Sequence, residues 1–217
     1  MAEKNILAFG DSLTWGANPE TGERHPAPDR WPNALQAALG PSIRVIAEGL
    51  GGRTTIYDDM TTSVDKNGGR VLPILLATHQ PLDLVVLMLG TNDLKPSIFG
   101  TIDGAIVGLE RLCRIIRDFD YYKGCTTPDI LLISPPLFCA MASGEPPRMN
   151  RSIAESHKFA PAIRVLAQRL GTGFFDAATV AQPSPIDGVH LDAANTRAIG
   201  SALAPIVLAR LAARASS

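Results

Sequence analysis

Three features are missing from this chain, and each absence removes a class of function. No run of about 18 apolar residues occurs, so we expect no membrane-spanning segment. The 20 lysines and arginines nearly balance the 21 aspartates and glutamates and are dispersed, which argues against a basic surface for nucleic acid. The phosphate-binding patterns G-x-x-x-x-G-K-[ST] and G-x-G-x-x-G before a helix are also missing. We therefore expect no phosphate-cradling loop and no cofactor.

Cysteine is scarce, and this bears on location and metal binding. The three cysteines (Cys113, Cys125 and Cys139) are scattered and odd in number, which argues against a disulfide framework and fits a reducing compartment. They form no C-x-x-C pair, and the four histidines form no H-x-x-x-H pair, so we expect no metal site. The first predicted strand follows only four residues, which leaves no room for a secretory signal peptide. We therefore expect a cytoplasmic protein.

What the chain does contain is an alternation of short apolar runs and amphipathic segments. This alternation is typical of βαβ units, and it predicts a single α/β domain over residues 1–217 with a parallel five-stranded sheet. The predicted strands are 5–10, 43–47, 83–89, 129–134 and 173–176, and the predicted helices are 30–39, 69–78, 103–119, 151–170 and 192–213. The Val, Ile and Leu content of the strands indicates burial on both faces of the sheet.

Two connections are long for an α/β fold, residues 15–29 and 134–150. Both follow strand ends and would rise at the same edge of the sheet. The second contains Leu137, Phe138 and Met141 among four prolines. Their apolar content favours walls of a substrate pocket or a subunit interface, and we expect a homo-oligomer; surface padding is the alternative.

A serine lies where the first predicted strand ends, in Gly-Asp-Ser-Leu at 10–13. Ligand crevices of open α/β sheets lie at the carboxyl ends of the strands, so the Ser12 hydroxyl is placed for chemistry. A serine becomes an effective nucleophile only beside a general base, with donors aimed at the developing oxyanion. Partners for Ser12 must therefore come from elsewhere in the chain.

The base is expected from Asp-Gly-Val-His at 187–190. Asp187 lies three residues before His190, so its carboxylate can fold back and hold one imidazole tautomer. The alternative is a surface loop whose aspartate caps a turn, but Asp192 is the expected N-cap of the last helix and leaves Asp187 free. The other histidines are expected at the surface or at caps: His25, His79 and His157.

Oxyanion donors are expected after two other strands. Asn92, in Gly-Thr-Asn-Asp at 90–93, follows an apolar strand, and its amide can donate a hydrogen bond without titrating. An Asx-turn is the alternative for this asparagine. Gly49, Gly51 and Gly52 follow the second strand and could expose a backbone N–H, or could simply form a tight loop.

These segments, in this order, resemble the blocks of the SGNH hydrolase (GDSL esterase/lipase) superfamily over essentially the whole chain. The resemblance implies a flavodoxin-like three-layer α/β/α sandwich. It implies Ser12 as nucleophile, His190 as base and Asp187 as the residue that orients the base. The implied oxyanion donors are the N–H groups of Ser12 and Gly52 and the side chain of Asn92. Glu48 stands where the family often has asparagine before its glycine, which leaves open which N–H among residues 49–52 points inward.

Residues 10–16 and 48–55 most resemble the arylesterase/acyltransferase branch of the superfamily. This implies hydrolysis of short-chain, acetyl-like esters, aryl esters included, with acyl transfer to alcohols or peroxide as an extension. The expected pocket residues are Asp11, Trp15, Leu137 and Phe138; ordinary packing is the alternative for Trp15. A carbohydrate acetyl esterase, a lysophospholipase or thioesterase, and a non-catalytic ligand-binding α/β module are the other functions that this pattern admits.

Overall fold

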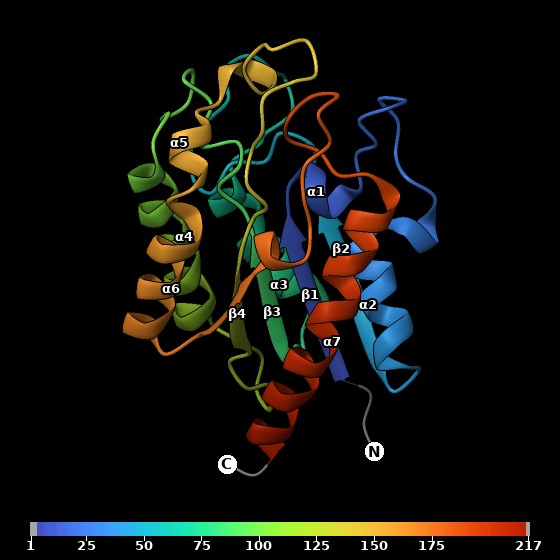
Figure 1. The fold of residues 1–217 in the computed structure, drawn as a ribbon. Helices are drawn as coiled ribbons and strands as arrows, with labels where there is room; N and C mark the ends of the chain where they lie inside the picture. Colours follow the sequence, from blue (N-terminus) through green and yellow to red (C-terminus); the bar gives the residue numbers. More distant parts are fainter. Residues whose placement is uncertain (1–3, 216–217) are drawn as a thin grey trace.

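The structure is a computed structural model that describes residues 4–215. Five parallel strands form one sheet in the order β2-β1-β3-β4-β5 (Figure 1). The strands are β1 (Lys4–Gly10), β2 (Ile43–Gly49), β3 (Leu84–Met88), β4 (Asp129–Ser134) and β5 (Gly173–Asp176). The helices are α1 (Ser12–Trp15), α2 (Trp31–Leu39), α3 (Gly68–His79), α4 (Ile102–Asp118), α5 (Ile153–Ser156), α6 (Phe159–Leu170) and α7 (Ala193–Ala215). The predicted α/β fold with a parallel five-stranded sheet is confirmed.

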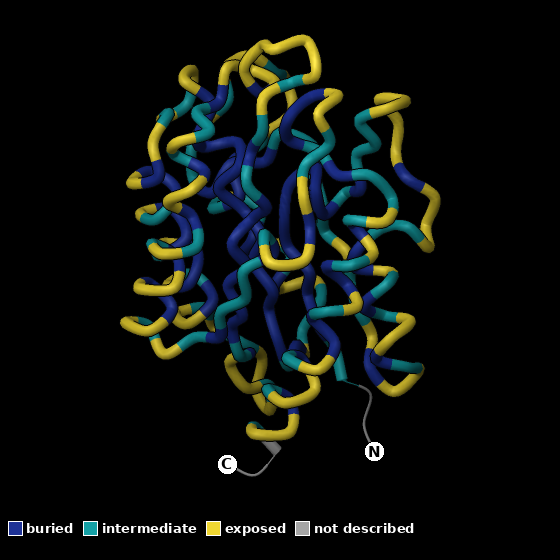
Figure 2. The backbone as a smooth tube through the Cα atoms, viewed as in Figure 1, coloured by how far each residue is buried: buried dark blue, intermediate teal, exposed yellow. Residues whose placement is uncertain are grey.

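Helices cover both faces of the sheet, which gives three layers. Successive side chains of a strand point to opposite faces, and β1 divides accordingly. Leu7 and Phe9 pack into the core with α3, α4 and α6, whereas Ile6 and Ala8 pack into the core with α1, α2 and α7. Figure 2 shows the central strands buried and the outward turns of the helices exposed. The strand order is that of flavodoxin-like folds, in which ligands bind at the carboxyl edge.

One predicted helix is in fact two. The predicted helix 151–170 is divided into α5 and α6, with His157 and Lys158 between them. Pro161 explains the break, because proline has no N–H to donate to the carbonyl of His157 and its ring would clash with that carbonyl in a continuous helix. In the first turn of α6 the same proline is tolerated.

The last helix tests the expectation that no segment could cross a membrane. By length and composition Ala193–Arg214 could do so, with a mean hydropathy of 1.3. That expectation overlooked this helix, because its apolar residues are spaced rather than continuous. Ile199, Leu203 and Val207 are fully buried in the core that α7 shares with α2 and the sheet. The helix is therefore a layer of this fold.

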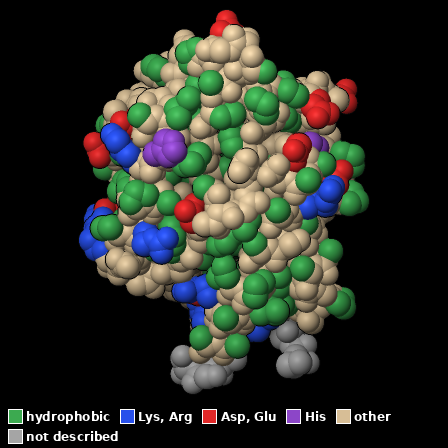
Figure 3. Space-filling model, in the orientation of Figure 1, with side chains coloured by type: hydrophobic (Ala, Val, Ile, Leu, Met, Phe, Trp, Pro, Cys, Tyr) green, Lys and Arg blue, Asp and Glu red, His purple; other side chains and the backbone are tan. Residues whose placement is uncertain are grey.

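Charged side chains are spread over the surface. On the face shown in Figure 3, acidic and basic side chains are scattered among apolar and other polar ones, and neither sign forms a large patch. This agrees with the formal net charge of −1.

Candidate active site

The first strand delivers Ser12 to the carboxyl edge of the sheet. β1 ends at Gly10, and α1 begins at Ser12. The buried carboxylate of Asp11 accepts the N–H of Leu13 at 2.9 Å and so caps this short helix. The N–H of Ser12 has no acceptor within the described part of the chain, as expected for the first turn of a helix. The N–H of Ser12 is therefore free to donate to a ligand.

The turn before α7 brings a histidine and an aspartate to this serine. His190 Nε2 lies 2.9 Å from Ser12 Oγ, and His190 Nδ1 lies 2.5 Å from Asp187 Oδ2. With the Nδ1 proton donated to Asp187, Nε2 accepts from the hydroxyl; this tautomer follows from the hydrogen-bond partners. Asp192 caps α7 as expected, since its carboxylate accepts the N–H of Asn195 at 2.8 Å. Asp187 is thereby left to His190.

The carboxylate of Asp187 stays ionised at physiological pH. Burial raises its pKa, but hydrogen bonds from the His190 ring and from the N–H groups of Val189 and His190 outweigh this effect. The pKa of Asp187 falls to about 2. A fixed negative charge beside Nδ1 stabilises the imidazolium that forms when His190 takes a proton.

Asn92 reaches the same edge from the loop after β3, and its amide orientation is determined by its neighbours. Arg151 Nη2 donates to Asn92 Oδ1 at 2.8 Å, so that atom must be the oxygen. Asn92 Nδ2 donates to the Arg53 carbonyl at 3.0 Å and lies 3.4 Å from Asp11 Oδ2. The second contact is long, so one N–H of this buried amide remains available to an oxyanion.

The glycine segment supplies two further N–H groups. Leu50 N–H is occupied, since it donates to the Gly10 carbonyl at 3.2 Å. Gly51 and Gly52 both line the cavity at Ser12, and neither N–H has an acceptor among residues 4–215. Gly52 has a φ of +83°, a conformation that glycine adopts without strain. The candidate oxyanion donor among residues 49–52 is therefore the N–H of Gly51 or that of Gly52.

The order and geometry of these segments agree with one protein family. Residues 8–198 match the model of the GDSL-like lipase/acylhydrolase family. The chain belongs to this family. No protein of curated function matches the chain.

Three solved structures resemble the whole of this GDSL-like chain. A protein from Agrobacterium tumefaciens str. C58, named a putative arylesterase, is 50% identical, with 95% of this chain and 99% of that chain covered and a TM-score of 0.92. A carbohydrate acetylesterase family member from Sinorhizobium meliloti is 48% identical, with 96% and 99% covered and a TM-score of 0.89. The M. smegmatis aryl esterase is 38% identical, with 95% and 99% covered and a TM-score of 0.87.

The residues that line the cavity of this GDSL-like protein differ from those expected. Of the four expected pocket residues, Trp15 lines it, whereas Asp11, Leu137 and Phe138 do not. Asp11 is buried beneath the site, where burial raises its pKa. Phe138 packs edge-on against Phe159 in the core, with ring centroids 6.1 Å apart. That loop therefore uses its aromatic ring for packing, which removes Phe138 from the expected subunit interface as well.

The end of the same long loop provides the wall instead. Arg148, Met149 and Arg151 line the cavity, together with Lys95 from the loop after β3. None of these was predicted from the sequence: the walls expected within 134–150 were apolar, residue 151 was expected in a helix, and Lys95 was not singled out. Arg148 directly follows Pro146 and Pro147, which restrict the backbone there but do not indicate which way the arginine side chain points.

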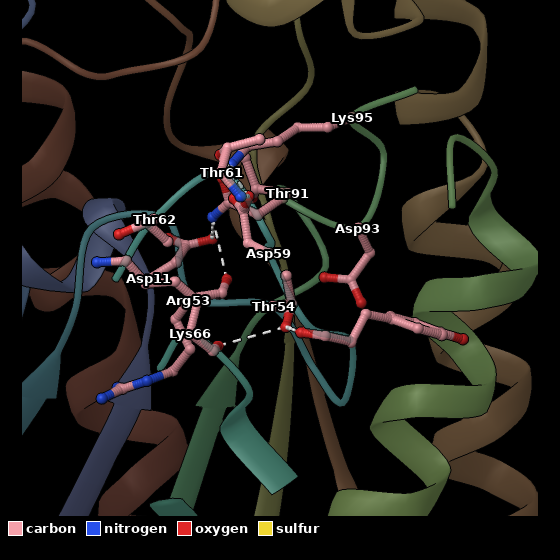
Figure 4. A network of polar contacts seen from close by, with 12 residues as sticks. Asp11, Arg53, Thr54, Asp59, Thr61, Thr62, Lys66, Thr91, Asp93 and Lys95 are labelled. Carbon is pink, nitrogen blue, oxygen red and sulfur yellow. Dashed lines mark hydrogen bonds and ion pairs between the residues drawn. The ribbon is translucent and has the colours of Figure 1, made fainter. Parts of the chain in front are cut away.

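Polar groups beside the cavity form a connected network (Figure 4). Lys95 Nζ pairs with Asp59 at 3.1 Å, and both side chains are nearly buried. The Asp93 carboxylate, fully buried, accepts the N–H of Thr55 at 3.2 Å. Burial raises the pKa of Asp93 to about 6. This network joins the loop after β3, which carries Asn92, to the segment after β2.

The remaining histidines lie away from Ser12. His25 is buried, contrary to the surface position expected for it, and its Nε2 lies 2.9 Å from the Leu191 carbonyl. His79 pairs with Glu48 at 3.0 Å at the end of α3, and His157 lies between α5 and α6. Within residues 4–215, no group of three His, Cys, Asp or Glu side chains is placed to hold a metal ion.

Proposed function

We propose that this carboxylic ester hydrolase cleaves short-chain esters, aryl esters among them, by acyl transfer through Ser12. The observation that carries the proposal is the continuous contact from Asp187 through His190 to the Ser12 hydroxyl at the edge of a cavity. The relatives named aryl esterase and carbohydrate acetylesterase support the substrate class.

The first step forms an acyl-enzyme. Ser12 Oγ attacks the ester carbonyl carbon as His190 Nε2 takes the hydroxyl proton, and Asp187 stabilises the resulting imidazolium. The carbonyl oxygen becomes an oxyanion that accepts hydrogen bonds from Ser12 N–H, Gly52 N–H and Asn92 Nδ2. The intermediate then collapses: the bond to the alkoxy oxygen breaks, and His190 gives its proton to the leaving alcohol.

The second step releases the acid. Water attacks the acyl carbon while His190 takes one of its protons, and the same donors hold the second oxyanion. When Ser12 Oγ leaves, it recovers a proton from His190, and the enzyme returns to its starting state. Acyl transfer is the same step with an alcohol or peroxide in place of water.

Substitution of the serine tests the proposal. Ser12→Ala should lower kcat for 4-nitrophenyl acetate by about 10⁴–10⁶-fold, as in other serine triads. Ser201→Ala, at an exposed position on α7, is the matched control and should retain normal kcat. A fluorophosphonate probe should label Ser12, located by peptide mass spectrometry. Near-normal turnover by folded Ser12→Ala protein, or labelling elsewhere, would exclude Ser12 as the nucleophile and favour a binding module.

A carbohydrate acetylesterase is the second candidate, because a relative 48% identical over 96% of the chain has that family name. Release of acetate from acetylated sugars at a kcat/KM above that for phenyl acetate would favour it. Activity rising steadily with acyl length would instead favour a lysophospholipase or thioesterase. Acyl transfer, cytoplasmic location and assembly into homo-oligomers remain predictions from the sequence.

A further inference from the structure

The cavity at Ser12 is small and carries positive charge. Its volume is about 310 Å³, and its described lining includes Lys95, Arg148 and Arg151 but no aspartate or glutamate. The whole chain has a formal net charge of −1, so this excess of positive charge is local. A concave site lined by one sign of charge attracts ligands of the other sign.

Two of the three cations are already engaged by the protein. Lys95 forms its nearly buried pair with Asp59. Arg151 donates to the Thr91 carbonyl at 2.9 Å and to Asn92 Oδ1, and burial lowers its pKa to about 10. The charge of Lys95 is balanced by Asp59, and all three guanidinium nitrogens of Arg151 already donate to protein oxygens.

Arg148 differs from both. Its side chain is exposed, and its guanidinium forms no hydrogen bond or ion pair with any residue in 4–215. Glu20 and Glu23, on the loop between α1 and α2, are exposed and are not among the cavity-lining residues. Arg148 therefore offers a free guanidinium at the cavity, and its planar donors match a carboxylate.

The backbone holds this arginine in place. Arg148 N–H donates to the Asp187 carbonyl at 2.8 Å, and its own carbonyl accepts from the Arg151 guanidinium. The next two residues, Met149 and Asn150, have φ values of 64° and 55°. These lie in the left-handed region, which residues other than glycine rarely adopt. Such conformations are strained and persist where surrounding contacts impose them. The turn that presents Arg148 is thus rigidly tied to the segment carrying Asp187.

A further cation, Lys66, lies near the glycine segment without lining the cavity. Lys66 lies beside Gly52, with its Cε 3.5 Å from where a Cβ on that glycine would be. Burial lowers the pKa of Lys66 first, and the charges of Lys95 and Arg53 lower it further. Figure 4 shows Arg53, Lys66 and Lys95 gathered near Asp11 and Asp59. Asp11 and Asp59 are buried or nearly buried in contacts with protein groups, whereas Arg148 is not paired.

We infer that Arg148 binds a carboxylate carried by the substrate, so that the preferred substrates are short esters bearing a negative charge. The inference rests on the proposed esterase function and adds to it a substrate class. The carboxylate can belong to the acyl part or to the alcohol part of the ester. In either position it would accept two parallel hydrogen bonds from the guanidinium while the ester carbonyl lies at Ser12.

Pairs of nearly isosteric esters separate charge from shape. For the alcohol side, 4-acetoxybenzoate is compared with 4-acetoxybenzamide; for the acyl side, monomethyl glutarate is compared with its carboxamide analogue. The kcat/KM ratio of carboxylate to carboxamide is measured in each pair by acid release near neutral pH. We expect the wild type to prefer the carboxylate by about fivefold in at least one pair, the size of an exposed ion pair. The pair that shows the preference identifies which side of the ester carries the charge.

Variants assign the preference to Arg148. Arg148→Gln should bring the ratio to about one, and Arg148→Glu should invert it. The matched control is Arg111→Gln on α4, an exposed arginine without a described partner, which should keep the wild-type ratio. In the wild type, raising the salt concentration to about 1 M should reduce the preference, because exposed charges are then screened beyond about 3 Å.

Two results would overturn the inference: a wild-type ratio near one in both pairs, or a preference that survives in Arg148→Gln. The salt series on the wild type decides the matter if Arg148 variants fail to fold, since a preference insensitive to salt would contradict an exposed ion pair. Failure of the folded wild type to cleave any of the four esters and 4-nitrophenyl acetate would overturn the proposed function itself, which is a different outcome.

Discussion

For Asn92, an expected effect on catalysis and an expected effect on stability can be measured separately. Its side chain accepts from Arg151 and donates to the Arg53 carbonyl, and it lines the cavity. Asn92→Ala should lower kcat by about 10²–10³-fold if the amide is an oxyanion donor. It should also cost about 1–3 kcal/mol of stability, because a buried Arg151 donor loses its acceptor. Steady-state kinetics on the folded fraction separates the two effects. A stability loss with unchanged kcat would indicate that Asn92 only closes a turn.

Asp187 allows a prediction on activity and another on acid stability. Asp187→Asn should lower kcat by about 10⁴-fold, since an amide at Nδ1 favours the wrong tautomer of His190. Esterase kinetics near neutral pH would test this, with circular dichroism to verify folding. Asp192→Asn, which alters the cap of α7, is a control that should leave kcat within about threefold of wild type. A similar loss in both variants would point to damage of the whole turn.

The lowered pKa of Asp187 determines the direction in which the free energy of unfolding changes with pH. A carboxylate whose pKa is lower in the folded state contributes stability above its unfolded pKa, and this is lost as pH falls through the folded pKa. This stability is therefore lost as the pH falls from about 4 to about 2. Urea unfolding of wild type and Asp187→Asn should show their stability difference shrinking by about 2 kcal/mol between pH 5 and pH 2. A difference independent of pH would mean that the carboxylate is not stabilised by its contacts.

Which of the candidate residues lie together could be predicted well from the sequence, and which residues surround them could not. Ser12, Asp187, His190, Asn92 and Gly52 lie at one edge, as their positions after strand ends predict. Arg148 and Arg151 were missed, because nothing in a loop sequence indicates which side chains face a cavity. That orientation depends on contacts with Asp187 and Asn92, which lie far away along the chain.

At the scale of elements, the end of β2 supports the turn that carries Ser12. A Cβ on Gly49 would lie 2.2 Å from Trp15 N and 2.6 Å from the Thr14 carbonyl carbon, so β2 and α1 meet backbone to backbone there. Gly49→Ala should therefore push α1 away and cost about 1–3 kcal/mol or more. Gly51→Ala is the matched control for stability, because a Cβ there meets nothing within 4 Å. Equal unfolding midpoints for the two variants would show that α1 can shift freely.

The predicted bounds of a strand or helix agree with the structure where the residues at its ends determine them. β4 and β5 begin and end as predicted, because both are apolar runs bounded by polar or glycine residues. β2 runs two residues further than predicted, to Gly49, because its partner β1 continues to Gly10 and offers hydrogen bonds. Pro161, which divides the predicted helix 151–170, was visible in the sequence, and its effect on the preceding carbonyl could have been anticipated.

At the scale of the whole molecule, the two cores share one sheet. Each strand contributes side chains to both faces, so neither core can form without the same five strands. We therefore predict that the chain, proposed to be a single domain over 1–217, unfolds in one cooperative transition. Fluorescence reports Trp15 and the fully buried Trp31, whose backbone N–H donates to Thr196 of α7, and far-ultraviolet circular dichroism reports the helices. Transitions at different denaturant concentrations for the two probes would indicate separate folding units.

The sequence by itself determined the fold class and which candidate residues meet at one edge of the sheet. Alternating apolar runs specify a parallel α/β sheet, and such a sheet brings the residues after each strand to one edge regardless of their separation in sequence. Only the tertiary structure decided what surrounds those groups. Phe138 became core instead of pocket wall, and Arg148 became an unpaired charge at the cavity, because side-chain direction in loops depends on packing against distant segments.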